Sequence, residues 1–168
     1  MKVIIEGPNN VGKSTIIKEL KELQWFKNHN VEYFGPNTPK VLDFYKDLLD
    51  DYQNVICDRY AISELVYSEY YKRKCNIELE DIVKILNKRD VVLIFVDAQY
   101  EFIVNSYNNK REEFDYNFVR YERLKFSEYE KLITDKCQDC KIIHVFNTVD
   151  SNVSITDIIN KILLQREW

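Results

Sequence analysis

The chain has 168 residues, of which 45% are hydrophobic and 31% charged, and it carries a net charge of −4 at pH 7. This length supports one well-buried core, so we expect a single domain over residues 1–168, and the composition excludes a disordered chain. The acidic balance offers no general attraction to a polyanion, which counts against a nucleic-acid partner. No stretch of transmembrane length lacks charges, so we expect a cytoplasmic protein with no membrane partner.

A phosphate-binding motif opens the chain. An apolar run that ends at Glu6 is followed by Gly7-Pro-Asn-Asn-Val-Gly12-Lys13-Ser14, which matches the pattern Gly-x4-Gly-Lys-Ser. The apolar residues of 16–23 recur at helical spacing, so strand, loop and helix stand in the order that the motif requires. Two of the three glycines of the chain lie at the ends of this loop, where the backbone turns tightly and approaches a ligand.

Each part of this loop has an expected task. Backbone N–H groups surround a phosphate oxygen at the positive end of a helix dipole. Lys13 adds a positive charge for the β- and γ-phosphates, and Ser14 offers a hydroxyl ligand to Mg²⁺. The residues predicted to bind the nucleotide here are Gly7, Asn10, Val11, Gly12, Lys13, Ser14 and Thr15.

The rest of the chain alternates strand-like and helix-like segments. After the first strand and helix, we predict strands over 31–34, 54–57, 91–96 and 142–146, and helices over 41–49, 60–72, 80–87, 101–107, 116–133 and 154–164, the last capped by Ser154. The polar cluster 108–113 is expected to interrupt a helix as a mobile segment. This alternation predicts an α/β fold with a five-stranded parallel sheet and helices on both faces.

In such a sheet, ligands bind beyond the carboxyl ends of the strands. The residues expected at this rim are Glu6, Phe34, Asp58, Asp97 and Asn147. Phosphoryl transfer needs mainly positioned cations and an in-line acceptor, so Lys13 and the arginines near the rim are the first candidates for catalysis.

The four cysteines are expected to be reduced and structural. They lie at positions 57, 75, 137 and 140, in a chain whose size does not require disulfides. The pair Cys137-Gln-Asp-Cys140 has the spacing of a metal site but lacks a second pair, and His29 and His144 each stand alone.

The segment Asp58-Arg59-Tyr60-Ala-Ile-Ser63-Glu-Leu-Val-Tyr67, which follows a buried run, resembles the Asp-Arg-Tyr motif of thymidylate kinases and the matching segment of deoxynucleoside kinases. The run Ile5-Glu6-Gly7, the strand 90–97 and the basic segment 110–114 before a long helix are similar to parts of both families. The resemblance covers most of the chain. It implies a three-layer P-loop kinase sandwich with ATP and Mg²⁺ as cofactors and a lid at about 107–116.

The same resemblance implies functions for individual residues. Asp58 would orient a water bound to Mg²⁺, so Ser14 and Asp58 are the expected metal ligands, and Arg59 would hold the acceptor phosphate. Lys110 or Arg111 would clamp the donor phosphates. The residues expected to face the acceptor are Asn9, Phe34, Arg59, Tyr60, Ser63 and Tyr67, and Asn147 and Val149 belong to a loop, 147–151, expected to pack on the donor adenine. Because related thymidylate kinases are commonly dimers, a homodimer is a further expectation.

Departures from the family pattern bear on the substrate. Asn9 stands where thymidylate kinases usually carry an aspartate that contacts the sugar, and Ser68 replaces a glutamine that helps to read thymine. Phe34 and Gly35 replace an Arg-Glu pair whose glutamate is the base in deoxynucleoside kinases. A phosphate monoester is already largely ionised at neutral pH and needs no such base, which favours a monophosphate acceptor.

Several functions therefore remain open at this point. The first is an ATP- and Mg²⁺-dependent nucleoside monophosphate kinase that phosphorylates dTMP or another deoxynucleoside monophosphate, and the alternative is a deoxynucleoside kinase that phosphorylates a 5′ hydroxyl. A kinase of a nucleotide within DNA and a non-catalytic nucleotide sensor are further alternatives. A GTP-binding switch is disfavoured, because Asn147-Thr-Val-Asp150 lacks the expected lysine and the segment 58–61 has no switch glycine.

Overall fold

The computed structural model describes residues 1–35, 41–87, 90–110, 112–151 and 153–164. These residues form a five-stranded parallel sheet in the order β2-β3-β1-β4-β5, as predicted. The strands are β1 (Lys2–Glu6), β2 (Asn30–Tyr33), β3 (Val55–Asp58), β4 (Val91–Ala98) and β5 (Lys141–Asn147). The helices are α1 (Lys13–Glu22), α2 (Leu42–Asp51), α3 (Ala61–Tyr70), α4 (Leu79–Leu86), α5 (Tyr100–Lys110), α6 (Tyr116–Lys136) and α7 (Ile155–Leu164).

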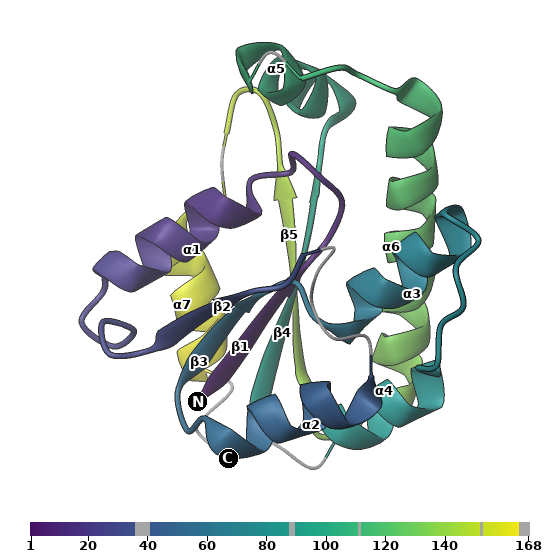
Figure 1. The fold of residues 1–168 in the computed structure, drawn as a ribbon. Helices are drawn as coiled ribbons and strands as arrows, with labels where there is room; N and C mark the ends of the chain where they lie inside the picture. The colour runs from purple at the N-terminus through teal and green to yellow at the C-terminus, as the bar shows by residue number, and fades with distance from the viewer. Residues whose placement is uncertain (36–40, 88–89, 111, 152, 165–168) are drawn as a thin grey trace.

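The sheet is covered on both faces, and this explains why its central strands are apolar throughout. Helices α1 and α7 lie on one face, and α2, α3, α4 and α6 lie on the other (Figure 1). Along β1, Val3 and Ile5 belong to the hydrophobic core on the face covered by α1 and α7, and Ile4 belongs to the core on the opposite face. All three side chains are fully buried. A strand buried on both faces gains from apolar side chains in both directions.

The register of the sheet brings the expected functional rim together. Ile5 of β1 lies opposite Asp58 of β3 and Ile94 of β4, so β1 and β3 reach their carboxyl ends side by side. Phe34 also joins this rim, because its backbone N–H donates to the carbonyl of Asp58 at 3.1 Å. None of the helices formed by the described residues has the length and apolar character needed to cross a lipid bilayer.

Several helix ends differ by one to three residues from the sequence-based prediction, and two of these differences have a clear local cause. The predicted helix end at residue 107 is wrong, because α5 continues to Lys110; residues 108–110 are exposed polar residues that extend a helix anchored by the buried Ile103 and Tyr107. The predicted break between the two helices is confirmed, and among the described residues it lies at 112–115. Helix α3 ends at Tyr70 rather than at residue 72, because Lys72 adopts a left-handed backbone with φ of 50°. Ser154 caps α7 as predicted, since its Oγ accepts from the backbone N–H of Thr156 at 3.2 Å.

Gly7 allows the phosphate loop to pass against β4. Its φ is 144°, and a Cβ placed on it would lie 2.0 Å from the carbonyl oxygen of Val96, which is backbone and cannot rotate away. The loop can therefore leave β1 along this path only because residue 7 has no side chain.

We predict that Gly7→Ala lowers the free energy of unfolding by about 2–4 kcal/mol, because the alanine combines a disfavoured backbone conformation with a steric clash. Denaturant unfolding measures this change. Gly35→Ala is the matched control, since a Cβ at residue 35 meets nothing within 4 Å, and it should change stability by less than about 0.5 kcal/mol. Equal effects of the two substitutions would contradict the steric explanation.

Candidate active site

A side chain from the edge strand β5 holds the phosphate loop in shape. Asn147, the last residue of β5, donates from Nδ2 to the carbonyl of Val11 at 2.8 Å and accepts at Oδ1 from the backbone N–H of Val153 at 3.2 Å. Gly12, with φ of 97°, lies so close that a Cβ there would be 2.8 Å from Asn147 Nδ2. Asn147 thus braces the loop, in addition to its predicted place beside the donor base.

The side chain of Lys13 is buried against the phosphate loop. Its Nζ donates to the carbonyl oxygens of Gly7, at 3.0 Å, and Pro8. Burial, with a smaller contribution from the positive charge of Arg59, lowers the pKa of Lys13 to about 7. Phosphate groups placed beside this ammonium would favour its charged form.

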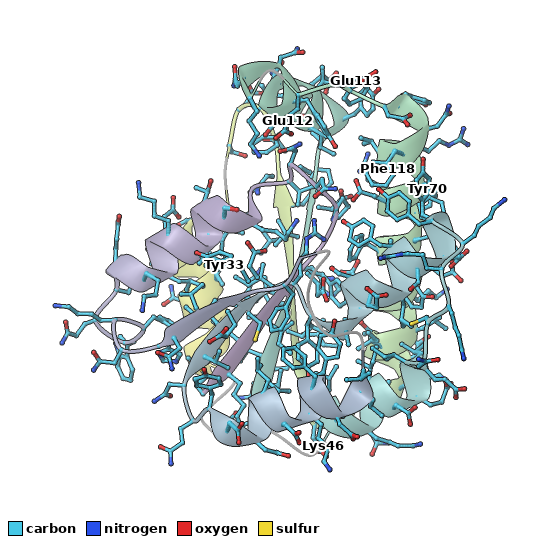
Figure 2. All side chains as sticks on the ribbon, in the orientation of Figure 1. Tyr33, Lys46, Tyr70, Glu112, Glu113 and Phe118 are labelled. Carbon is cyan, nitrogen blue, oxygen red and sulfur yellow. The ribbon has the colours of Figure 1, made fainter. Side chains whose placement is uncertain are left out.

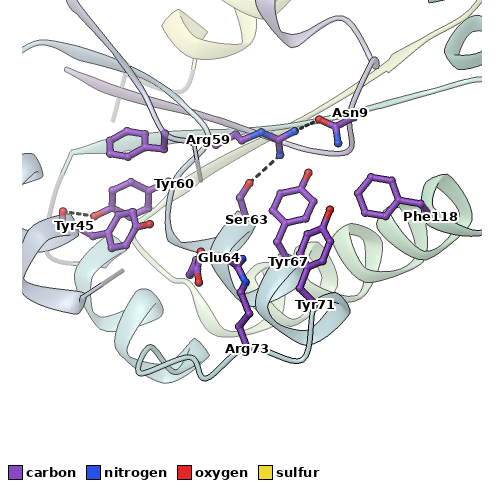
Figure 3. A pocket seen from close by; sticks show the side chains of 12 residues that line it. Asn9, Tyr45, Arg59, Tyr60, Ser63, Glu64, Tyr67, Tyr71, Arg73 and Phe118 are labelled. Carbon is purple, nitrogen blue, oxygen red and sulfur yellow. Dashed lines mark hydrogen bonds and ion pairs between the residues drawn. The ribbon is translucent and has the colours of Figure 1, made fainter. Parts of the chain in front are cut away.

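Arg59 connects the phosphate loop to α3. Its backbone has a φ of 74°, and its guanidinium donates to the carbonyl of Gly7 at 3.1 Å. It also donates to Oγ of Ser63 at 3.1 Å and to Oδ1 of Asn9 at 2.7 Å (Figure 3). The same guanidinium lies over the ring of Tyr67, 5.1 Å from its centroid. These contacts hold a planar cation at the boundary between the loop and the helix.

Glu6 and Ser63 form the base of this arrangement. The fully buried carboxylate of Glu6 accepts from the backbone N–H of Ser63 at 3.1 Å and from its hydroxyl. Burial raises the pKa of Glu6 to about 7, against the opposing effects of the Ser63 hydrogen bonds and the Arg59 charge. Glu6 therefore fixes the start of α3 relative to β1.

Glu122 of α6 belongs to the site, although the sequence analysis did not single it out. Its fully buried carboxylate accepts from Asn9 Nδ2 at 2.7 Å and from the hydroxyl of Tyr67 at 2.6 Å, and burial raises its pKa. One signal was available in the sequence. Glu122 lies three residues after Val119 and four before Phe126, so a charge interrupts the apolar stripe of α6.

Two neighbouring cavities meet at this cluster. The larger, of about 530 Å³, is lined by residues of the phosphate loop, α1, β3, α5 and the segment after it: Asn9, Asn10, Gly12, Lys13, Ser14, Thr15, Asp58, Arg59, Phe102, Ser106, Tyr107, Lys110 and Glu112. The other, the aromatic cavity, has a volume of about 280 Å³, and half of its twelve described lining residues are aromatic: Asn9, Phe34, Gly35, Tyr45, Arg59, Tyr60, Ser63, Glu64, Tyr67, Tyr71, Arg73 and Phe118 (Figure 3). Among the residues that the structure describes, only Asn9 and Arg59 line both cavities.

The predicted site residues divide between these cavities. The polar cavity contains five of the phosphate-loop candidates, Asn10, Gly12, Lys13, Ser14 and Thr15, together with Asp58 and Lys110, whereas Gly7 and Val11 line neither cavity. The aromatic cavity contains Phe34, Tyr60, Ser63 and Tyr67. Val149 lines neither cavity and is 49% exposed. Arg111 lies outside the described residues.

Ser14 and Asp58 suit a magnesium ion. Both line the polar cavity, both offer oxygen, and Mg²⁺ is typically bound by one or two protein oxygens together with substrate phosphates and water. Within the part of the chain that the structure describes, the Asp58 carboxylate makes no hydrogen bond or ion pair, so its oxygens face the cavity without protein donors. A cluster of three or more His, Cys, Asp or Glu side chains that could bind a metal without phosphates is absent from these residues.

Asn10 joins the phosphate loop to the end of α5. Its Oδ1 accepts from Lys110 Nζ and from Ser106 Oγ, and its Nδ2 donates to Glu112 at 3.1 Å. Figure 2 places Glu112 just beyond α5, on the side of the loop. Asn10 has a φ of 60°, a conformation that asparagine tolerates better than most residues. One side chain therefore holds the Lys110 ammonium beside the polar cavity.

Comparisons with known proteins agree on the fold. No protein-family model matches the chain. The SPbeta prophage-derived uncharacterized protein YorR of Bacillus subtilis (strain 168) is 36% identical over 73 residues, which are 42% of this chain and only 44% of YorR. The crystal structure of YorR in complex with phosphorylated GDP covers 100% of this chain and 99% of YorR, with a TM-score of 0.68 and 18% identity.

Two solved kinases share the same architecture. Deoxyadenosine kinase from M. mycoides with bound dCTP covers 98% of this chain and 100% of its own, with a TM-score of 0.59 and 18% identity. Shikimate kinase from Acinetobacter baumannii in complex with shikimate covers 99% of this chain and 95% of its own, with a TM-score of 0.54 and 12% identity. The fold is therefore that of the P-loop kinases.

We predict that the binding of Mg²⁺-ATP at pH 8 takes up about one proton, and less at pH 6. Lys13 has a pKa of about 7, so it is mostly neutral at pH 8, and the bound phosphates raise that pKa. Titration calorimetry in buffers of different ionisation enthalpy measures the uptake. Lys13→Arg should abolish it, because arginine stays charged at both pH values. The absence of uptake by the wild type at pH 8 would contradict the assigned pKa.

We also predict that Asn10→Gly, which keeps the positive φ accessible, weakens ATP affinity about 10-fold by releasing Lys110. Lys110→Ala should have a similar effect. If Asn10 acts through Lys110, Asn10→Gly will change ATP affinity by less than about 2-fold in the Lys110→Ala background. Fully additive effects in this double-mutant cycle would show that the two side chains act independently.

Proposed function

We propose that this chain is an ATP- and Mg²⁺-dependent nucleoside monophosphate kinase, similar to thymidylate kinase, that transfers the γ-phosphoryl group of ATP to a deoxynucleoside monophosphate. The observation that carries this proposal is the meeting of a polar cavity and an aromatic cavity at two residues, Asn9 and Arg59. The polar cavity takes the donor phosphates, and the aromatic cavity takes the acceptor nucleoside. The two reacting groups then meet beside a guanidinium.

Arg59 suits an acceptor phosphate. It presents a planar, permanently charged fork at the shared wall, and this group binds phosphate oxygens bidentately. Its present partners, a carbonyl oxygen, an amide and a hydroxyl, are neutral, so it brings positive charge to the boundary. The solved proteins of this fold include one in complex with phosphorylated GDP and one with bound dCTP, which supports nucleotides as ligands.

The transfer itself needs little from the protein beyond position and charge. An oxygen of the acceptor phosphate attacks the γ-phosphorus, and the bond from that phosphorus to the β–γ bridging oxygen breaks. The acceptor oxygen is already ionised at neutral pH, so no proton has to be removed. Lys13, Arg59 and Lys110 offset the charge that spreads over the phosphoryl oxygens, and Mg²⁺, when bound by Ser14 and Asp58, neutralises the donor phosphates.

Residues 1–168 act as one kinase domain in this proposal, with the segment 107–116 as the lid. Of the two candidate lid cations, Lys110 belongs to the described residues, and its hydrogen bond to Asn10 of the phosphate loop supports its assignment as a lid cation. Phe34 and Gly35, in the place of the Arg-Glu pair that supplies the catalytic glutamate of deoxynucleoside kinases, offer no side-chain proton acceptor, and Phe34 packs against Phe44, Tyr45 and Tyr60.

A deoxynucleoside kinase is the second candidate, and one observation favours it. The Asp58 carboxylate lines the polar cavity beside Arg59 and makes no hydrogen bond or ion pair with any other residue that the structure describes, so it is available to accept a proton from a 5′ hydroxyl. This alternative predicts transfer to deoxynucleosides and none to their monophosphates.

We predict that Arg59→Ala lowers kcat/KM for monophosphate acceptors by about 10²–10³-fold, because it removes charge-assisted hydrogen bonds made in the transition state. The assay measures ADP release and phosphorylated product with ATP, Mg²⁺ and a panel of deoxynucleosides and deoxynucleoside monophosphates. Arg120→Ala, an exposed arginine on α6 outside both cavities, is the control and should keep wild-type turnover. Turnover confined to deoxynucleosides would replace the first candidate with the second.

A further inference from the structure

Two cysteines lie close together in the chain where α6 ends and β5 begins. Cys137 directly follows α6, and its N–H donates to the carbonyl of Ile133 at 2.7 Å, while Cys140 directly precedes β5. Both are free thiols in the structure. Neither thiol lines the polar cavity or the aromatic cavity, so the proposed kinase reaction does not use them.

The bend between these two cysteines is held by a side chain from another element. Asn87 directly follows α4, and its Oδ1 accepts from the backbone N–H of Gln138 at 3.0 Å and from that of Asp139 at 3.3 Å. A bend whose backbone is already fixed loses little further conformational freedom when its two ends are joined by a bond.

The two thiols differ in their access to solvent. Cys137 is partly exposed, whereas Cys140 is 8% exposed and belongs to the hydrophobic core on the face that α2, α3, α4 and α6 cover. The Cys140 thiol donates to the carbonyl of Val91 at 3.7 Å. A reagent in solution therefore reaches the sulfur of Cys137 first.

The two thiols are also neighbours in space. The Cys140 thiol can donate a hydrogen bond to the sulfur of Cys137, and this bond lowers the pKa of Cys137 and raises that of Cys140. Burial, the Asp139 carboxylate and the negative end of the α6 dipole oppose the ionisation of Cys137. Cys137 is therefore the thiol of the pair that ionises more readily and can act as the nucleophile.

We propose that Cys137 and Cys140 form a site of reversible oxidation, at which a low-molecular-weight disulfide converts the two thiols into one intramolecular disulfide. With glutathione disulfide as the oxidant, the Cys137 thiolate attacks one sulfur, forms a mixed disulfide and releases a glutathione thiolate. Cys140 then loses its proton and attacks the sulfur of Cys137, which releases the second glutathione thiolate. The protein loses two protons and two electrons, and one glutathione disulfide becomes two molecules of glutathione.

The new bond acts on the stability of the fold. It connects the end of α6 to the start of β5, and it restricts the unfolded chain over residues 137–140. The cysteines lie at the amino end of β5, and Asn147, which braces the phosphate loop, lies at its carboxyl end. Oxidation therefore leaves the contacts of the phosphate loop in place.

The test incubates the folded protein in buffers with different ratios of oxidised to reduced glutathione, blocks the remaining thiols with a maleimide and maps the peptides by mass spectrometry. The wild type should form the disulfide between Cys137 and Cys140 with an equilibrium constant at least about 10-fold larger than that of the same chain unfolded in urea, because the folded bend holds the sulfurs together. Since this ratio equals the stabilisation of the fold by the bond, the oxidised protein should melt about 3–6 °C above the reduced protein.

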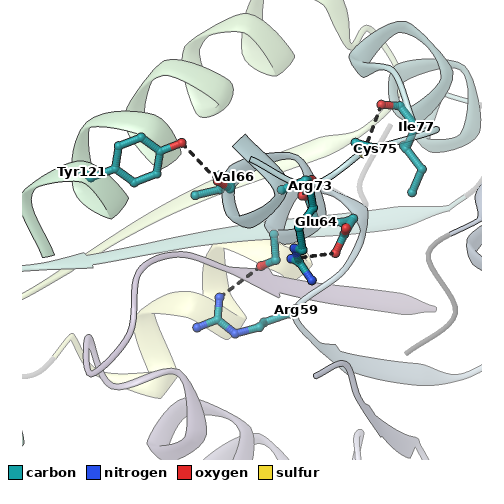
Figure 4. Close-up of polar contacts among 9 residues, drawn as sticks. Arg59, Glu64, Val66, Arg73, Cys75, Ile77 and Tyr121 are labelled. Carbon is teal, nitrogen blue, oxygen red and sulfur yellow. Dashed lines mark hydrogen bonds and ion pairs between the residues drawn. The ribbon is translucent and has the colours of Figure 1, made fainter. Parts of the chain in front are cut away.

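Variants separate the two steps of the reaction. Cys140→Ser should stop at a mixed disulfide of Cys137 with glutathione, and Cys137→Ser should leave Cys140 as a thiol. Cys75→Ser is the matched control, because Cys75 is also partly exposed but its thiol donates to the carbonyl of Ile77 at 3.6 Å in another part of the chain (Figure 4). This control should form the disulfide as the wild type does.

The melting temperature of each reduced variant checks its folding, and Cys140→Ala replaces Cys140→Ser if the serine variant does not fold. A wild type that forms no disulfide between Cys137 and Cys140 at any glutathione ratio, or that accumulates only the mixed disulfide, would overturn the proposal. An equilibrium constant no larger than that of the unfolded chain would also overturn it. None of these measurements uses kinase activity, so the outcome is independent of the proposed function.

Discussion

The hydrogen bonds of the Arg59 guanidinium hold the site together. This guanidinium connects the phosphate loop, through the carbonyl of Gly7 and the side chain of Asn9, to α3, through Ser63. The backbone of Arg59 is left-handed, which is uncommon for a residue other than glycine. Its N–H donates to the carbonyl of Ile5 at 2.9 Å. Conformations of this kind persist where the surroundings determine them strongly, and such surroundings are common at functional sites.

Around this cation, burial and charge oppose each other. Lys13, Glu6 and Glu122 are all buried, and burial disfavours the charged form of each of them, which is why the pKa of the lysine falls and those of the carboxylates rise. Carboxylates and cations within one cluster limit its net charge before any ligand binds. A site of this kind can accommodate several phosphate charges for two reasons. The phosphates raise the pKa of Lys13 and so favour its protonated form, and they also attract the cations that are already charged.

Much of this molecule could be predicted from its sequence, and the exceptions have physical causes. The phosphate loop and the apolar strands are local patterns, so the five-stranded sheet was predicted correctly. Glu122 depends on where α6 packs, which its own sequence does not state, although a charge within an apolar stripe was a usable signal. Asn10 and its contact with Lys110 join segments 100 residues apart, and the turn at Lys72 lacks the glycine that usually marks it.

The order of the strands also has a consequence for how the chain folds. β1 is the first strand made, yet it lies in the centre of the sheet, with Lys2 opposite Val55 on one side and Val91 on the other. During synthesis the first strand must therefore wait for more than half of the chain before both of its edges are paired, and pairing of this range is slow. Because the phosphate loop directly follows β1, the loop takes its folded position late, and the proposed nucleotide ligand can stabilise a nascent chain only after β4 has left the ribosome.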